Sequence, residues 1–198
     1  MSMIILKKEF DAPEINLSEV KRYMKVKSSS NEFDDLIFQC LNEANPLLRY
    51  SICYSISKVA VCDDNVLFDN ITFKSEALSK VLEFCDRAVI FSATVGLGVD
   101  RMIAKYSRIS PSKALCMHAV GAERIESLCD SFCEYITSEH GDVTHRFSPG
   151  YGDFNIASQR IILNILDSAK LIGLTLNDSF IMTPTKSVTA IAGIRRKD

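Results

Sequence analysis

No stretch of this 198-residue sequence is long and apolar enough to cross a bilayer, since a spanning helix needs roughly 18 or more apolar residues. The opening run MSMIILKKEF is also too short for a signal peptide, and its charges follow the apolar part instead of preceding it. We therefore expect a cytoplasmic protein that has no membrane partner.

An excess of basic charge is missing as well. The chain has 23 Lys and Arg against 25 Asp and Glu, a net charge of −2. A protein that binds nucleic acid by neutralising phosphates needs a basic surplus, so we expect no nucleic-acid partner.

The sequence also lacks the cysteine patterns of metal and redox sites. None of its seven cysteines forms a CxxC pair, and most lie in apolar stretches, which is typical of small buried side chains in a reducing compartment. Cys129 and Cys133 are one helical turn apart, but no His completes a ligand set, so we expect no metal site. No Ser/His/Asp or Cys/His order indicates a nucleophilic hydrolase.

The length favours one domain covering residues 1–198, with a helical N-terminal part up to about residue 47. Alternating apolar residues predict a strand over 50–61 and a returning strand over 66–73. A nearly continuous apolar run predicts a central strand over 86–95. Because helices and strands are mixed without regular alternation, the predicted class is α+β.

Ser110-Pro111 opens the longest predicted helix, and Gly141 ends it. Its apolar positions follow a heptad spacing, which predicts one buried seam that includes a core histidine. The seam consists of Leu115, His118, Ala122, Ile125, Cys129, Phe132 and Ile136.

Beside that seam, the same helix carries a stripe of acidic residues at spacings of three and four. The stripe consists of Glu123, Glu126, Asp130 and Glu134. Two interpretations stay open: a solvated face, or a face on which one or two carboxylates meet a cation or accept ribose hydroxyls. Asp130 and Glu134 are the pair of greater interest, because they lie toward the end of the helix from which the chain leaves for Arg146.

Two glycine-containing or basic turns are weaker candidates. Gly96-Leu97-Gly98 lies between a strand and a helix, but Arg101 stands where a dinucleotide-binding loop has its third glycine, which favours an ordinary turn. Lys186 lies in a turn before the last strand, where it either is solvated or faces the same cleft as Arg146.

The strongest local signal is the run Arg146-Phe147-Ser148-Pro149-Gly150-Tyr151. Arg146 offers a planar fork of donors for a carboxylate, and glycine at position 150 lets a ligand approach the backbone closely. Tyr151 offers a ring for stacking on a base or a sulfonium. These features suit an amino acid joined to adenosine. The alternative is a surface turn in which Arg146 pairs with Asp142 or Asp153.

This run resembles the Arg-x-x-x-Gly-Tyr signature of the reactivation domain of cobalamin-dependent methionine synthase. The later segments Ile172–Leu176, Ser179–Met182 and Pro184–Val188 are similar to the end of that domain. Ala93–Gly96 and Gly121–Glu123 resemble small stand-alone bacterial members. The likeness runs from about Leu17 to Ile194, and it is more specific in the C-terminal half.

The resemblance implies a C-shaped α+β domain with a central antiparallel sheet, a long helix and an S-adenosylmethionine site. It implies that Arg146 binds the methionine carboxylate, that Ser148 contributes backbone contacts, and that Tyr151 packs on the ligand. It further places Asp130 at a ligand-contacting acidic position, with Glu134 beside it. The family's N-terminal acidic contact has no position that we can assign.

The family's role is to support reductive remethylation of cob(II)alamin. The resemblance therefore implies an accessory protein that is not a complete enzyme alone. Its expected partners are a truncated cobalamin-dependent methionine synthase, which carries the cobalamin, and a flavodoxin- or ferredoxin-type electron donor. The alternatives are a non-catalytic corrinoid-protein partner that has lost S-adenosylmethionine binding, and a methyltransferase acting on another acceptor.

Overall fold

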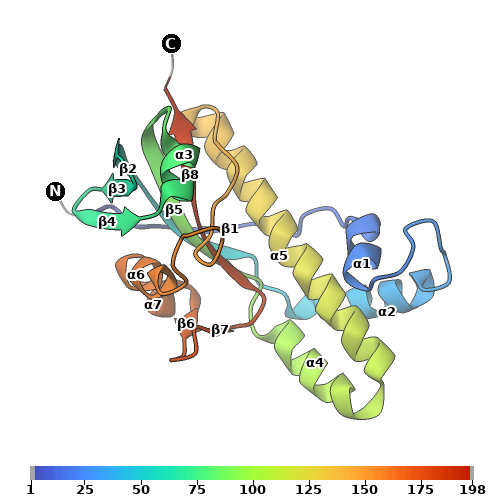
Figure 1. Cartoon of the computed structure of the whole chain (residues 1–198). Coiled ribbons are helices and arrows are strands. Elements are labelled where there is room, and N and C mark those ends of the chain that lie inside the picture. Colours follow the sequence, from blue (N-terminus) through green and yellow to red (C-terminus); the bar gives the residue numbers. More distant parts are fainter. Residues whose placement is uncertain (1–2, 197–198) are drawn as a thin grey trace.

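The computed structural model describes residues 3–196, in which mixed helices and strands are arranged around an antiparallel sheet (Figure 1). The strands of the main sheet are β1 (Leu6–Glu9), β2 (Ser51–Cys62), β3 (Asn65–Phe68), β4 (Ile71–Lys74), β5 (Cys85–Thr94) and β8 (Ser187–Arg195). A separate small ribbon pairs β6 (Thr175–Leu176) with β7 (Met182–Thr183). The helices are α1 (Leu17–Tyr23), α2 (Asp34–Ala44), η1 (Asn45–Leu47), α3 (Glu76–Leu82), α4 (Gly98–Ile109), α5 (Pro111–His140), α6 (Ser158–Ile165) and α7 (Ser168–Ile172).

The sheet runs in the order β4-β3-β2-β5-β8, and the long strand β2 also pairs with β1 along its first residues. The predicted central strand is confirmed, because β5 pairs with β2 on one side and β8 on the other. The prediction of one returning strand over 66–73 is wrong. That segment forms two strands, β3 and β4, because Asp69 takes a positive φ of 52° and reverses the chain. The N-terminal part, expected to be helical, also contributes the edge strand β1.

Both faces of the sheet are covered, so side chains alternate between two hydrophobic clusters. Val89 and Phe91 of β5 pack under α5 and the helices beyond it. Ala88 and Ile90 face the other way, toward the layer made by α3, α6 and α7. Consecutive apolar residues in this strand are therefore explained by burial on both sides.

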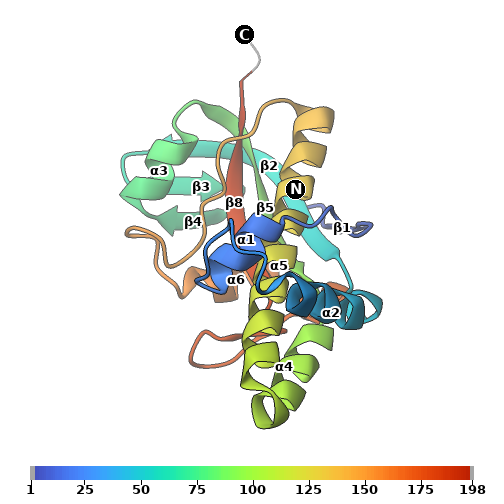
Figure 2. The same ribbon diagram turned by 90° about the vertical axis from the view of Figure 1, so that its right-hand side faces the viewer.

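Helix α5 connects the sheet with a lobe made by α1, α2 and α4, which pack along it. In the second view α1 lies in front of the sheet and α4 lies below it (Figure 2). The seam predicted for α5 is correct only in its second half. Phe132 and Ile136 are fully buried against the sheet, whereas Leu115 is 50% exposed and His118 is exposed. The reason is a change of neighbour: the first half packs on α2 and α4, so a different set of residues, including Met117, faces inward.

A buried ion pair on α5 fixes the segment that leads into α1. Arg124 donates to the carbonyls of Pro13 and Glu14 at 2.6 and 2.8 Å. Glu123 accepts from the amide of Asn16 at 3.0 Å and pairs with Arg124. Both charged side chains are almost fully buried, and each is compensated by the other and by main-chain groups. Glu123 is thus a structural member of the acidic stripe.

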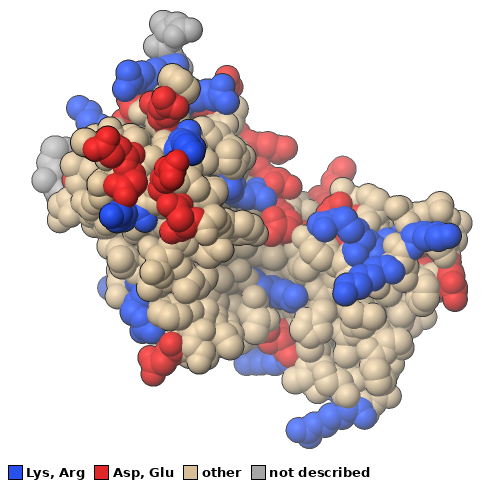
Figure 3. Space-filling model, in the orientation of Figure 1, with Lys and Arg blue, Asp and Glu red and all other residues tan. Residues whose placement is uncertain are grey.

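The space-filling view shows the molecule hollowed between the sheet and the helical lobe, with acidic and basic side chains reaching the hollow (Figure 3). No helix of residues 3–196 is long and apolar enough to serve as a membrane span.

Candidate functional site

An extended segment after α5 runs along the outer edge of β8. Thr144 donates its amide to the carbonyl of Gly193 at 2.8 Å. Phe147 and Ile191 exchange both of their main-chain hydrogen bonds, each at 2.9 Å. We call residues 142–147 the strap. Arg146 lies between these two anchor points, so the sheet edge sets its backbone position.

The turn that follows depends on glycine. Gly150 has a φ of +97°, which ordinary side chains rarely adopt, and its amide donates to the carbonyl of Phe154 at 2.7 Å. Phe154 is fully buried and stacks on Phe147 at a centroid distance of 6.2 Å. The turn is therefore anchored in the core, and it leaves Tyr151 66% exposed at the surface.

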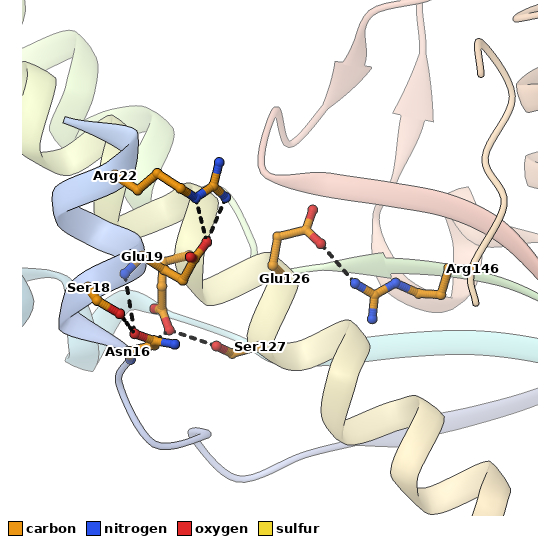
Figure 4. A network of polar contacts seen from close by, with 8 residues as sticks. Asn16, Ser18, Glu19, Arg22, Glu126, Ser127 and Arg146 are labelled. Carbon is orange, nitrogen blue, oxygen red and sulfur yellow. Dashed lines mark hydrogen bonds and ion pairs between the residues drawn. The ribbon is translucent and has the colours of Figure 1, made fainter. Parts of the chain in front are cut away.

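Arg146 is paired with two carboxylates of α5. Its Nη2 donates to Glu126 at 2.9 Å, as Figure 4 shows, and its Nη1 donates to Asp130. Burial of the guanidinium favours the neutral form, but the neighbouring Cys129 and Asp130 outweigh that effect and raise the pKa of Arg146. Arg146 is thus a fixed cation whose fork is already satisfied.

The surface-turn alternative named two other partners for Arg146, Asp142 and Asp153, but Arg146 forms its ion pairs with Glu126 and Asp130 instead. The carboxylate of Asp153 accepts from the hydroxyl of Ser75 and from the amides of Glu76 and Ala77, at the start of α3. Asp142 is held through its main chain, whose carbonyl accepts from the amide of Arg195 at 2.9 Å.

The acidic stripe of α5 divides into three environments. Glu123 is buried in its pair with Arg124, Glu126 and Asp130 meet Arg146, and Glu134 is exposed beyond the strap contacts. The interpretation in which one or two carboxylates meet a cation therefore applies to Glu126 and Asp130. Glu126 was not among the residues predicted for the site, although its four-residue spacing from Asp130 is the signal that could have selected it.

A cavity of about 440 Å³ opens beside Arg146, within the range of roughly 300–1,000 Å³ that is usual for small-molecule pockets. Of the predicted site residues, Arg146, Ser148 and Tyr151 line it directly. Asp130 lies at its margin, in two adjoining pockets, and Gly150 shapes the turn. The remaining lining residues are Glu126, His145, Phe147, Pro149, Gln159, Met182, Ser187, Val188 and Thr189.

Gln159 and Thr189 are two further lining residues that sequence reasoning missed as site candidates. Gln159 is 8% exposed and Thr189 is 2% exposed. Within residues 3–196, neither Oε1 of Gln159 nor Oγ1 of Thr189 has a hydrogen-bonding partner. No local motif marks either residue, because the cavity is formed only when α6 packs against β8.

A second hollow of about 330 Å³ lies on the other side of Glu126, toward α1. It is lined by polar residues, among them Glu19, Arg22 and Tyr23. Figure 4 shows Glu19 and Arg22 of α1 on the side of Glu126 that is away from Arg146. Glu19 and Arg22 pair with each other at 2.6 Å. The two hollows share Glu126, which therefore stands between them.

Other predicted candidates lie outside this cavity. His118 is exposed, so the prediction of a core histidine is wrong. The part of its ring that its neighbours cover, together with the nearby charge of Lys186, lowers its pKa. Lys186 packs over Gly121, where its partial burial lowers its pKa, and it does not face the cavity of Arg146. Within the described part of the chain, no group of three or more His, Cys, Asp or Glu is arranged to hold a metal ion.

Comparisons with known proteins give a structural match. No family model and no curated protein matches the sequence. Among solved structures, the chain is similar to the MetH reactivation domain crystallised with AdoHcy, with a TM-score of 0.74 and 13% sequence identity. The match covers 99% of this chain and 80% of that one. The predicted α+β class with a central antiparallel sheet is confirmed, and the chain has the fold of the MetH reactivation domain.

Proposed function

We propose that this protein binds S-adenosylmethionine in the cavity beside Arg146. The observation that carries the proposal is a cation fixed between two carboxylates at the wall of a ligand-sized cavity. The fold is that of a domain whose crystal structure contains AdoHcy, the demethylated form of the same ligand. Arg146 supplies the fork that suits a carboxylate, and the exposed ring of Tyr151 suits a sulfonium.

The charge of the site matches the methylated ligand better than the demethylated one. S-adenosylmethionine carries a carboxylate, an ammonium and a sulfonium, a net charge of +1, whereas S-adenosylhomocysteine has no sulfonium. Arg146 with Glu126 and Asp130 has a net charge of −1. Complementary charge favours the cationic form, and the preference weakens as salt screens the exposed carboxylates.

The role that we propose for the bound ligand is methyl donation to a corrinoid on another protein. One electron from a flavodoxin- or ferredoxin-type donor and the methyl group of the sulfonium together convert cob(II)alamin to methylcobalamin, and S-adenosylhomocysteine leaves. The corrinoid belongs to a truncated methionine synthase. This chain contributes the binding and presentation of the methyl donor, and Arg146 holds the ligand's carboxylate in that role.

Thermal unfolding with and without S-adenosylmethionine tests the binding step. A ligand concentration of about a hundred times Kd stabilises a protein by about 2.7 kcal/mol, or about 5–10 °C in Tm for a chain of this size. We expect Arg146→Ala to remove most of the rise by weakening binding, and Arg108→Ala, on the exposed end of α4, to retain it. No rise with millimolar ligand in the wild-type protein contradicts the proposal.

Formation of methylcobalamin tests the presenting role. A corrinoid-loaded truncated synthase is mixed with reductant, S-adenosylmethionine and this protein, and the absorption spectrum of the corrinoid is followed. We expect remethylation that depends on this protein and on Arg146. Equal rates without this protein contradict the role, even where ligand binding has been shown.

One observation favours a second candidate function. Because Arg146 is already neutralised by Glu126 and Asp130, the site also suits a corrinoid-protein partner that binds no small molecule. That function predicts association with the corrinoid protein to the same extent in the wild type and in Arg146→Ala, without any ligand-dependent rise in Tm.

A further inference from the structure

The inner wall of the cavity holds two buried polar side chains whose hydrogen-bonding capacity is not met within residues 3–196, those of Gln159 and Thr189. Another polar side chain of the same strand is paired. The hydroxyl of Ser187 donates to the carbonyl of Pro184 at 2.8 Å and lies 2.8 Å from the hydroxyl of Thr94, from which it can accept. Buried polar atoms are nearly always partnered, so two unpartnered atoms on one cavity wall indicate a place for polar groups of a ligand.

The main chain of β8 adds to this wall. Ile191 directs its N–H and C=O to the outer edge of the sheet, where both bond to Phe147. Main-chain groups alternate in direction along an antiparallel strand, so those of Thr189, two residues earlier, point to the same edge. The strap has already turned away at Ser148, and Thr189 lines the cavity there.

The groups at this wall define a type of ligand edge. The Oε1 atom of Gln159 accepts hydrogen bonds, the hydroxyl of Thr189 donates or accepts, and the amide of Thr189 donates. An amino group next to a ring nitrogen meets these requirements. The neighbouring walls are apolar, with Phe147, Met182 and Val188 available to a flat ring.

We propose that Gln159 and Thr189 recognise the 6-amino edge of a purine and select adenosine over its 6-oxo counterpart. The assignment rests on the proposed function, because it gives the two ends of one ligand to two walls: the amino acid to Arg146 and the base to Gln159 and Thr189. A 6-oxo purine replaces the donor amino group with an acceptor and protonates the adjacent nitrogen. The Oε1 atom of Gln159 then faces an acceptor and the main-chain amide of Thr189 faces a donor, so these two contacts are opposed, whereas the hydroxyl of Thr189 can reorient to suit either base.

Calorimetric titration with S-adenosylmethionine and with its hypoxanthine analogue, S-inosylmethionine, tests the assignment. We expect the wild-type protein to prefer the adenine ligand by about tenfold or more, as the loss of a hydrogen bond to a buried group implies. Gln159→Leu, which keeps the approximate shape of the side chain, should remove most of that preference. Thr189→Val keeps the discriminating main-chain amide, so it should weaken both ligands and leave the preference in place. Thr189→Ser, which keeps the hydroxyl, should bind both ligands as the wild type does.

Arg146→Ala is the matched control for the other end of the ligand. It should weaken both ligands equally and leave the preference for adenine unchanged. Circular dichroism shows whether each variant is folded. Where one of the larger changes does not fold, the milder changes Thr189→Ser and Gln159→Glu are measured in its place. If the protein binds S-adenosylmethionine but Gln159→Leu keeps the wild-type preference, the assignment alone is overturned. Binding of neither ligand by the wild type overturns the proposed function and the assignment with it.

Discussion

At the scale of single residues, the guanidinium of Arg146 already has hydrogen-bond partners within the protein when no ligand is bound. Its fork bonds to Glu126 and Asp130, so a ligand carboxylate must exchange with at least one of them. Asp130 is the more exposed partner, at 66% against 46% for Glu126, and it is the easier one to release. The ligand's binding free energy at this site therefore depends on the difference between the ion pair that its carboxylate forms with Arg146 and the internal ion pair that it replaces.

Asp130→Asn should change the selectivity of the site in a defined direction. Loss of one carboxylate frees part of the Arg146 fork and removes a negative charge near the sulfonium position. We expect the preference for S-adenosylmethionine over S-adenosylhomocysteine to fall by about fivefold to tenfold, equivalent to about 1–1.4 kcal/mol. Titration of both ligands at low and high salt measures it, with Glu134→Gln as the control. An unchanged ratio in Asp130→Asn contradicts this account.

At the scale of elements, α5 illustrates what the sequence could and could not predict. Its extent and its buried residues from Ile125 onward follow from local spacing, because that half faces one sheet. Leu115 and His118 were predicted to be buried but are exposed, because the first half of α5 packs on α2 and α4 and buries a different face of the helix. A heptad pattern assumes a constant partner along the helix, and here the partner changes.

Paired substitutions on α5 test this division. Phe132 is fully buried and contacts the rings of Tyr54 and Phe91 at centroid distances of 5.0 and 4.8 Å. Phe132→Ala should lower the free energy of unfolding by about 3–5 kcal/mol, whereas Leu115→Ala should change it by less than about 1 kcal/mol. Urea unfolding measures both. Equal losses would show that the first half is buried as the heptad pattern predicted.

The start of α3 depends on a carboxylate from a distant loop. Hydrogen bonds from Ser75, Ala77 and Glu76 lower the pKa of Asp153 below its usual range. A lowered pKa in the folded state stabilises the protein above the unfolded-state pKa of about 3.9, and the stabilisation is lost as the pH falls through the folded-state value. Asp153→Ala should therefore lower Tm at pH 7, and the difference should shrink below about pH 4. A pH-independent difference in thermal unfolding contradicts this.

At the scale of the whole molecule, the site could be predicted only in part. The run from Arg146 to Tyr151 was visible as a motif, because the arginine, the tight turn and the aromatic ring lie together in the sequence. Glu126, Gln159 and Thr189 come from three other elements. Their approach depends on α5, α6 and β8 packing around one sheet, which no local pattern specifies.

The strap joins the ligand cavity to the edge of the sheet, and this connection has a measurable consequence for backbone dynamics. The amides of Thr144 and Phe147 are bonded to β8 on either side of Arg146. An amide exchanges with solvent only when its bond opens, and a ligand held by Arg146 would restrain that opening. Hydrogen–deuterium exchange at Thr144, Phe147 and Ile191 should therefore slow on ligand binding, while the amides of the β3–β4 hairpin keep their rates. The strap amides would thus serve as a built-in reporter of occupancy.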